Sequence, residues 1–278
     1  MKVIIALFLM LLASYHSFGQ DITEENYLRL DSALWMQYEQ DMNEISDCYR
    51  KFPDKKDSLN KESKRILDIA GKKNEELALK FATVPSGLQR VFMVRLAIPK
   101  DTLKSVLANL PEEMRRSPYA KSIRYHIETE QIKEGDRYYD FEATTADGQP
   151  FTLSSLEGKN ILLLYGGLGC MGKEGRDYLN KIYSLTPRDS FEIVVYCPNS
   201  NLDNLQKVRE EYPSEYILVS DFLQDHTPVK ILYGAQTTPT SFFINKQGIV
   251  VMKTEGLKQE TVNWLLQEKN GLNVNMDN

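Results

Sequence analysis

Apolar side chains recur mostly three or four positions apart over residues 26–52, which lines one face of a helix. The members of this series are Leu28, Leu30, Leu34, Tyr38, Met42, Ile45 and Tyr49. A similar series fills residues 56–84, and shorter helices are predicted over residues 90–98, 101–110 and 117–131. Pro85, Ser86 and Gly87 are expected to break the run between them. Because this half shows no strand pattern, we predict a mainly α-helical region over residues 22–131.

The pattern changes at Gly135. Two strand-like runs flank Asp147 and Gly148, which predicts a β-hairpin. Strands and helices then alternate. Strands are predicted at residues 160–165, 191–197 and 216–220, and helices at 174–184 and 202–212, followed by a short helix through residue 232. A second hairpin is predicted at residues 240–254, with a closing helix at 259–268. This order predicts an α/β domain with a mixed central sheet flanked by helices.

The N-terminus has the layout of a secretory signal peptide. Lys2 precedes an apolar run from Val3 to Ala13, and small residues lead to a predicted cleavage site after Gly19. The run is too short for a bilayer, which takes about 20 apolar residues, and no later stretch spans one. We therefore expect a signal peptide at residues 1–19, a helical domain at 20–134 and an α/β domain at 135–278. The mature protein is expected to be exported, periplasmic and soluble, with no transmembrane segment.

Charge and ligand chemistry narrow the function classes. The net charge is −5, and loss of Lys2 with the signal peptide makes it −6. A mildly acidic chain without a basic block argues against nucleic acid as a partner. The mature chain holds two histidines, His126 and His226, which lie far apart, so no zinc site is expected. No phosphate-cradling glycine loop occurs, and no cofactor is predicted.

Two further stretches carry a resemblance to a known family. An Asp140-Phe141 pair, the Asp147-Gly148 turn and Leu156-x-Gly158-Lys159 precede the first core strand, and Thr-Pro-Thr-x-Phe-x-Ile stands at residues 238–244. In combination these residues resemble the exported thioredoxin-like proteins of the TlpA/ResA and AhpC/TSA-related group. The resemblance covers residues 135–268 and implies a thioredoxin-like fold with an N-terminal β-hairpin. It also implies exchange with protein or peptide thiols and disulfides in the cell envelope.

The family's active-site motif is incomplete in this chain. The resemblance places the nucleophilic cysteine of a Trp-Cys-x-x-Cys motif at Cys170, whereas Gly169 replaces the tryptophan and Lys173 replaces the second cysteine. A cysteine at a helix N-terminus is favoured as thiolate, and Lys173, one turn on, would add a cation near the sulfur. Alternatively, Lys173 points to solvent and Cys170 is an inert remnant. The resemblance further implies a cis peptide before Pro239, beside the sulfur, with the Thr238 backbone free to pair with an extended peptide.

The other cysteines leave alternatives open. Cys197 ends the second core strand, and parallel strands deliver their C-terminal ends to one edge of a sheet, so the two sulfurs could lie near one another and Cys197 is a possible resolving thiol. The alternative is a small apolar core residue. Cys48, in the helical region, is a third potential partner, and an external thiol is a fourth.

A peroxidase is not expected, because Gly167 stands where that mechanism needs a hydroxyl three positions before Cys170. Arg176 is interpreted as a solvated charge on the helix.

Two functions remain open from the sequence. The first is a thiol–disulfide oxidoreductase in which Cys170 attacks a disulfide while Thr238 and Pro239 hold the substrate strand. Cys197 or an external thiol would then resolve the mixed disulfide. The second is a non-catalytic module that binds a protein or peptide through the same surface or through the helical domain. Fold alone does not choose between them.

Overall fold

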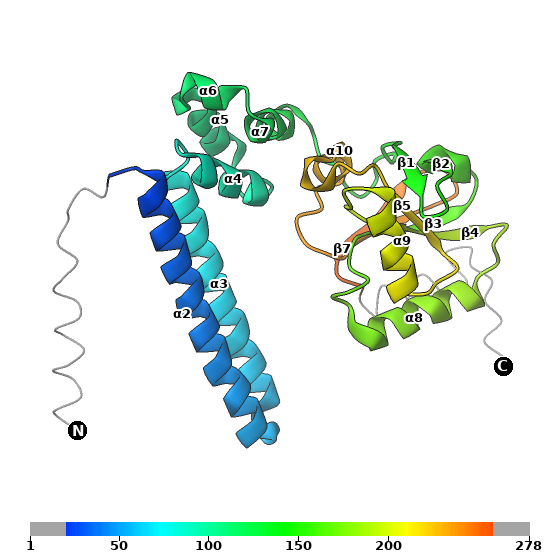
Figure 1. Ribbon diagram of the computed structural model, residues 1–278. Helices are drawn as coiled ribbons and strands as arrows, with labels where there is room; N and C mark the ends of the chain where they lie inside the picture. The colour runs from blue at the N-terminus through cyan, green and yellow to red at the C-terminus, as the bar shows by residue number, and fades with distance from the viewer. Residues whose placement is uncertain (1–20, 258–278) are drawn as a thin grey trace. The chain divides into compact units, whose positions relative to one another are not determined.

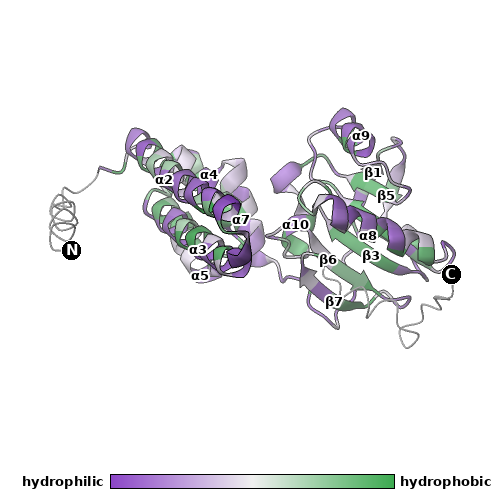
Figure 2. Ribbon diagram, turned by 90° about the horizontal axis from the view of Figure 1, so that it is seen from below, coloured by the Kyte–Doolittle hydropathy of each residue, from purple (hydrophilic) through white to green (hydrophobic). Residues whose placement is uncertain are grey.

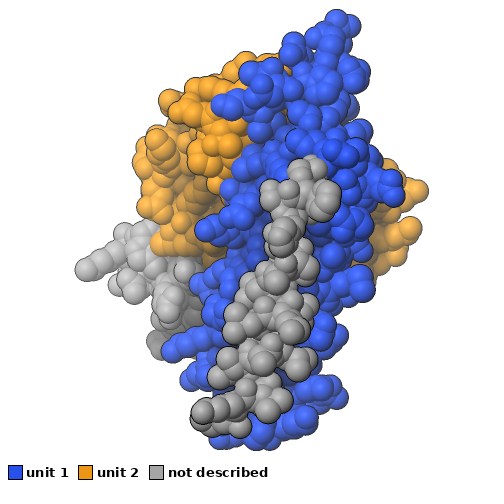
Figure 3. Space-filling model, turned by 90° about the vertical axis from the view of Figure 1, so that its left-hand side faces the viewer, with its two compact units in different colours: residues 1–93, 105–120 blue, residues 94–104, 121–278 orange. Residues whose placement is uncertain are grey.

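The computed structural model describes residues 21–257. The chain divides into two compact units, coloured in Figure 3. The first comprises residues 1–93 and 105–120, and the second comprises residues 94–104 and 121–278. The predicted signal peptide and the predicted closing helix lie outside the described residues, and the predicted domain boundary at residue 134 stays a prediction. Within residues 21–257, no helix combines the length and apolarity needed to span a membrane.

The first unit is built on two long helices (Figure 1). Helix α2 (Glu24–Lys51) turns through the 3-10 helix η1 (Pro53–Lys55) into α3 (Lys56–Lys80). Thr23 caps α2, since its side-chain oxygen accepts from the Asn26 backbone N–H at 3.2 Å. Along the chain follow α4 (Pro85–Val94), α5 (Lys100–Asn109), α6 (Glu112–Arg115) and α7 (Pro118–Glu128), of which residues 94–104 and 121–128 belong to the second unit. The helical prediction for this region is confirmed.

The start of α4 corrects one prediction. A break was expected at residues 85–87 and a helix at 90–98, but α4 begins at Pro85 and ends at Val94. Proline is tolerated in the first turn of a helix, where its missing N–H would have no partner. Gly87 has a packing role, because a Cβ there would lie 2.0 Å from the Phe81 carbonyl oxygen. Here Pro85 starts a helix, and Gly87 lets that helix pack closely against Phe81.

The second unit contains a seven-stranded mixed sheet, as predicted. Its strands are β1 (Glu142–Thr145), β2 (Pro150–Thr152), β3 (Asn160–Tyr165), β4 (Phe191–Tyr196), β5 (Ile217–Ser220), β6 (Thr240–Ile244) and β7 (Val250–Glu255). The spatial order is β2-β1-β5-β4-β3-β6-β7. Strands β3, β4 and β5 are parallel, and the remaining pairs are antiparallel. Between the strands lie η2 (Leu153–Leu156), α8 (Gly172–Leu185), α9 (Leu202–Glu211), η3 (Gln224–His226) and α10 (Pro228–Leu232).

Strand β3 separates two hydrophobic clusters. Ile161, Leu163 and Tyr165 join one cluster, which also contains residues of α10. Leu162 and Leu164 join the other, which contains residues of α8 and α9. This alternation follows from the two-residue repeat of a strand, and burial on both faces explains why residues 161–164 of β3 are all apolar (Figure 2).

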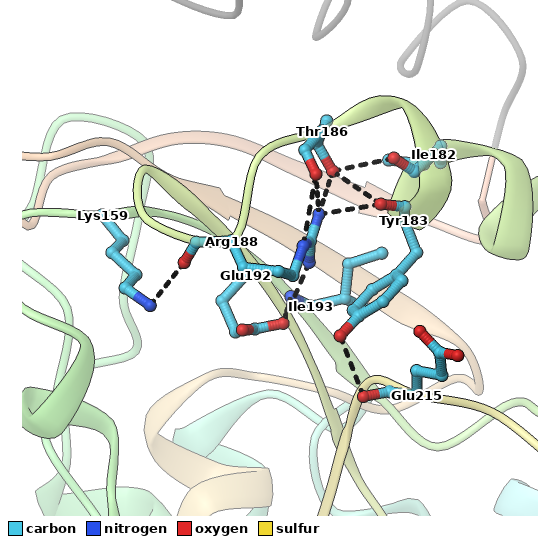
Figure 4. Close-up of polar contacts among 8 residues, drawn as sticks. All are labelled: Lys159, Ile182, Tyr183, Thr186, Arg188, Glu192, Ile193 and Glu215. Carbon is cyan, nitrogen blue, oxygen red and sulfur yellow. Dashed lines mark hydrogen bonds and ion pairs between the residues drawn. The ribbon is translucent and has the colours of Figure 1, made fainter.

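Arg188 fixes the C-terminal end of α8 (Figure 4). Its Nη2 donates to the carbonyl oxygens of Tyr183 and Thr186, at 3.0 and 2.7 Å, and its Nη1 donates to Glu192 at 3.1 Å. The guanidinium carbon lies 3.8 Å from the centroid of the Tyr183 ring. A basic side chain at a helix C-terminus satisfies carbonyls that lack intrahelical partners. The anchored helix presents its other end to the candidate site.

Candidate thiol site

The site begins where β3 ends. Gly166 and Gly167 follow Tyr165 with φ angles of +65° and +99°, a backbone conformation that favours glycine. The Met171 backbone N–H donates to the Gly167 carbonyl oxygen at 2.9 Å and closes the turn that carries Cys170. Helix α8 starts at Gly172, two residues earlier than predicted. Cys170 therefore lies in an exposed turn directly before the helix.

The proline loop packs against these glycines. The Thr238–Pro239 peptide bond is cis, as predicted. Antiparallel pairing of β3 with β6 sets Tyr165 opposite Thr240, which brings the residues before Thr240 to the glycine turn. A Cβ at Gly167 would lie 2.4 Å from the Pro239 Cβ. The two glycines are thus required for the close approach of the loop.

The Cys170 sulfur contacts this proline loop. Its Sγ–H donates to the Thr238 carbonyl oxygen at 3.2 Å and lies 3.5 Å from the Gly167 carbonyl oxygen. The Thr238 hydroxyl is 3.7 Å from the same sulfur. The structure brings together Cys170, Thr238 and Pro239, three of the residues singled out from the sequence.

Lys173 is directed along the helix. Its ammonium pairs with Asp177, four residues on, at 2.5 Å, and its side chain is 82 % exposed. This is the solvent-facing alternative considered from the sequence. An i, i+4 pair of opposite charges was visible in the sequence and was the available signal for this contact.

All three cysteines are free thiols. Cys197 follows β4 and is only 6 % exposed, packed in the same cluster as Leu162 and Leu164. Burial raises the pKa of the Cys197 thiol to about 12. The Cys170–Cys197 disulfide is therefore not formed in this structure, and a resolving role for Cys197 stays a prediction. Cys48 lies half-buried on α2.

Two residues beside the thiol were not identified from the sequence as part of the site. Arg176 is half-buried, and its Nη1 donates to the Leu168 carbonyl oxygen at 2.9 Å. Its guanidinium lies 4.7 Å from the centroid of the Tyr212 ring. A Cβ at Gly169 would be 3.2 Å from the Tyr212 hydroxyl. Tyr212, from the end of α9, thus lies next to the position where the resemblance places a tryptophan.

No local pattern links α9 to α8, so this contact becomes visible only in the folded chain. The interpretation of Arg176 as a solvated charge is accordingly incomplete, because the side chain also braces the turn that carries Cys170. Within residues 21–257, no group of three or more His, Cys, Asp or Glu side chains is arranged to hold a metal ion.

Comparison with known proteins identifies similar sequences and structures for the α/β part of the chain. Residues 135–253 match the AhpC/TSA family. Thiol-disulfide oxidoreductase ResA of Bacillus cereus is 25% identical over 133 residues, which cover 48% of this chain and 75% of that protein. ResA of Halalkalibacterium halodurans is 26% identical over 132 residues, covering 47% and 73%.

Among solved structures, the thioredoxin domain of a thiol-disulfide oxidoreductase from Bacteroides vulgatus has a TM-score of 0.45 and 19% identity, covering 50% of this chain and 99% of that one. The mixed sheet, the family match and the ResA relatives lead to one assignment. The α/β part of this chain is a thioredoxin-like domain that matches the AhpC/TSA family over residues 135–253 and is similar to thiol-disulfide oxidoreductases of the TlpA/ResA type.

Proposed function

We propose that this protein is an exported thiol–disulfide oxidoreductase that works with Cys170 as its single active-site cysteine. The observation that carries the proposal is the exposed Cys170 sulfur, 3.2 Å from the Thr238 carbonyl oxygen and beside Pro239. An extended peptide that pairs with the Thr238 backbone would bring its disulfide to this sulfur. Main-chain pairing gives such recognition affinity without demanding one sequence.

The chemistry consists of two exchange steps. In the first, the Cys170 thiolate attacks one sulfur of a substrate disulfide, so that a mixed disulfide forms and the second substrate sulfur leaves as a thiolate. In the second, an external thiolate attacks the mixed disulfide, which returns Cys170 to the thiolate and leaves the substrate sulfur in a new disulfide. Electrons balance between substrate and external thiol. Cys170 lies in the exposed turn two residues before α8 begins, where its sulfur is accessible to a substrate disulfide.

The proposal assigns the resolving role to an external thiol. The position three residues after Cys170 is Lys173, which has no sulfur and pairs with Asp177. Cys197 is buried, and its raised pKa leaves little thiolate at neutral pH. A resolving thiol has to be accessible and ionised, and a small thiol or a partner protein from the surroundings satisfies both requirements.

The proposed compartment is the cell envelope. The support is the charged start, apolar core and small residues of positions 1–19. N-terminal sequencing of the protein from its source cells is expected to begin at Gln20. Recovery of a chain that starts at Met1 would contradict export.

The test of the thiol chemistry is capture of a mixed disulfide. Incubation with oxidised glutathione, followed by mass spectrometry, is expected to yield a glutathione adduct on Cys170 that added thiol removes. Cys170→Ser should abolish that adduct, whereas Cys48→Ser, which removes the half-buried thiol of α2, should retain it. Lys173→Cys should shorten the lifetime of the adduct, because the restored Cys-x-x-Cys pair resolves it internally. An adduct that forms elsewhere, or none at all, would contradict the proposal.

One observation favours the second candidate, a non-catalytic binding module: the Lys173 position lacks a thiol, and its charge is directed to Asp177. In that case the surface at Pro239 would bind extended peptides whatever their redox state. Equal affinity of the wild type and Cys170→Ser for reduced and oxidised forms of one peptide, with no mixed disulfide, would favour this function.

A further inference from the structure

The α2–α3 hairpin keeps an apolar seam that its own unit does not bury. Over residues 28–69 no residue is buried, although this stretch contains the predicted helical apolar series. In α2 the single buried side chain is Tyr27, near the start of the helix, and in α3 burial begins at Ala70. Helices in proteins gain most of their stability by packing an apolar face. Among the described residues of its own unit, the distal hairpin has no second layer to pack against.

Large apolar side chains on the hairpin are strongly exposed. Met36 is 67 % exposed, Leu28 51 %, Leu67 50 % and Ile69 42 %. Figure 2 shows hydrophobic residues recurring among polar ones along both helices. Of these four, Ile69 lies in the groove between the two helices, whereas Met36, about 200° round α2 from the groove residue Leu34, lies on another face.

One side of the seam is a groove, a cavity of about 120 Å³ between the two helices. Its floor is mostly apolar, with Leu34, Tyr38, Ile66, Ile69 and Ala70, and also includes the polar Gln37. Its rim carries Asp41 on the α2 side and Arg65 and Lys73 on the α3 side. An apolar floor between rims of opposite charge suits a partner with an apolar strip whose basic side meets the acidic rim and whose acidic side meets the basic rim.

The two helices carry opposite charge. Helix α2 has seven acidic and three basic residues, and its stretch 31–47 contains five acidic residues and no basic one. Helix α3 has seven basic and five acidic residues. Each hairpin therefore presents both halves of a complementary pair.

We propose that this hairpin is a dimerisation surface for a second copy of the chain. Two hairpins would pack about a two-fold axis into a four-helix bundle, with α2 of each copy beside α3 of the other. A two-fold interface is self-complementary, and the opposite charges of α2 and α3 provide that property within one chain. At 1.5 Å per residue, α2 spans about 42 Å, long enough for several layers of core packing. The inference is independent of the thiol chemistry.

The experiment is sedimentation equilibrium of the chain without residues 1–19, over a range of concentrations and with reductant so that no intermolecular disulfide contributes. A reversible monomer–dimer equilibrium is expected. Ile69→Ser, which removes an exposed groove side chain, and Asp41→Lys, which reverses the rim charge, should each raise the dissociation constant about tenfold or more. Both sites are outside the buried core, so helix content by circular dichroism should stay unchanged.

Asn43→Lys is the matched control for Asp41→Lys. It introduces the same side chain two positions on, about 200° further round α2 and so away from the groove. The dissociation constant should stay within about twofold of the wild-type value. A monomer at every concentration, or a dimer that none of the groove variants weakens, would overturn the proposal.

Discussion

The central strands and the distal helical hairpin differ sharply in how their apolar residues are covered. Every residue of β3 and β4 is buried, whereas no residue over 28–69 is. The strands have helix-covered layers on both faces, while each hairpin helix has one neighbouring helix along most of its length. An apolar repeat thus fixes the type of element, but the number of surrounding layers decides whether its side chains are buried.

Alkylation of the cysteines should show this difference most strongly. Cys197 lies at the buried end of β4, with a pKa raised to about 12, whereas Cys48 lies half-buried in the hairpin. Relative to a free thiol near 8.5, the thiolate fraction of Cys197 at neutral pH is lower by about three-thousandfold. Timed labelling with iodoacetamide and peptide mapping should therefore find the buried Cys197 the slowest of the three thiols and the exposed Cys170 the fastest. Cys48 should fall between them. Equal rates for Cys48 and Cys197 would break the comparison.

Adding one methyl group should have opposite effects in the two regions. Gly167→Ala places a Cβ 2.4 Å from Pro239 at a φ of +99° and should lower the free energy of unfolding by about 2 kcal/mol. Gly71→Ala, in α3, meets no atom within 4 Å and should raise local stability by about 1 kcal/mol. Hydrogen exchange of peptides from each region measures both. Destabilisation by Gly71→Ala would show that the hairpin is already closely packed there.

Acid should weaken the sheet unit and spare the hairpin. Burial, together with the charges of Lys100 and Arg95, lowers the pKa of His126 to about 4, against 6.5 for an ordinary histidine. Between pH 4 and 6.5, His126 is protonated in the unfolded chain and neutral in the folded one. Its contribution to the free energy of unfolding is therefore complete above about pH 6.5 and is lost as the pH falls towards 4. From pH 7 to 5 the loss is about 2 kcal/mol.

Denaturation at both pH values, with His126→Gln as the comparison, measures this contribution. In the variant, the free energy of unfolding should fall less between pH 7 and 5, because the His126 contribution is gone. The contribution of His226, whose pKa burial also lowers, remains. Helices α2 and α3 contain no histidine, so exchange in their peptides should show no matching change. If the variant loses as much unfolding free energy between pH 7 and 5 as the wild type, His126 is not the source of the pH dependence.

Local pattern was enough to predict most elements. Strand β3 was predicted to the residue. A short apolar run in an alternating order of strands and helices is typical of a strand buried on both faces. Helix α4 was misplaced because Pro85 and Gly87 also serve to start a helix and to seat it on Phe81, roles that depend on a neighbour. The exposure of the hairpin was not predicted, since periodicity says which face is apolar and nothing about what covers it.

The thiol site divides in the same way. The resemblance predicted that Cys170, Thr238 and Pro239 come together, because pairing of β3 with β6 brings those loops to one edge. The contacts of Arg176 with Leu168 and Tyr212 were missed, since they join α8 to α9 through tertiary packing. The Lys173–Asp177 pair was open to prediction from its four-residue spacing, and Cys197 was open to either role until its burial was known.

The contact between Gly167 and Pro239 has a consequence for how such chains evolve. With no room for a Cβ between them, a larger residue at 167 demands a displaced or different residue at 239, although the two codons are far apart in the gene. The pair is expected to change together or not at all. Covariation at these two positions would therefore trace descent of this loop arrangement among related sequences, whether or not they carry a second cysteine.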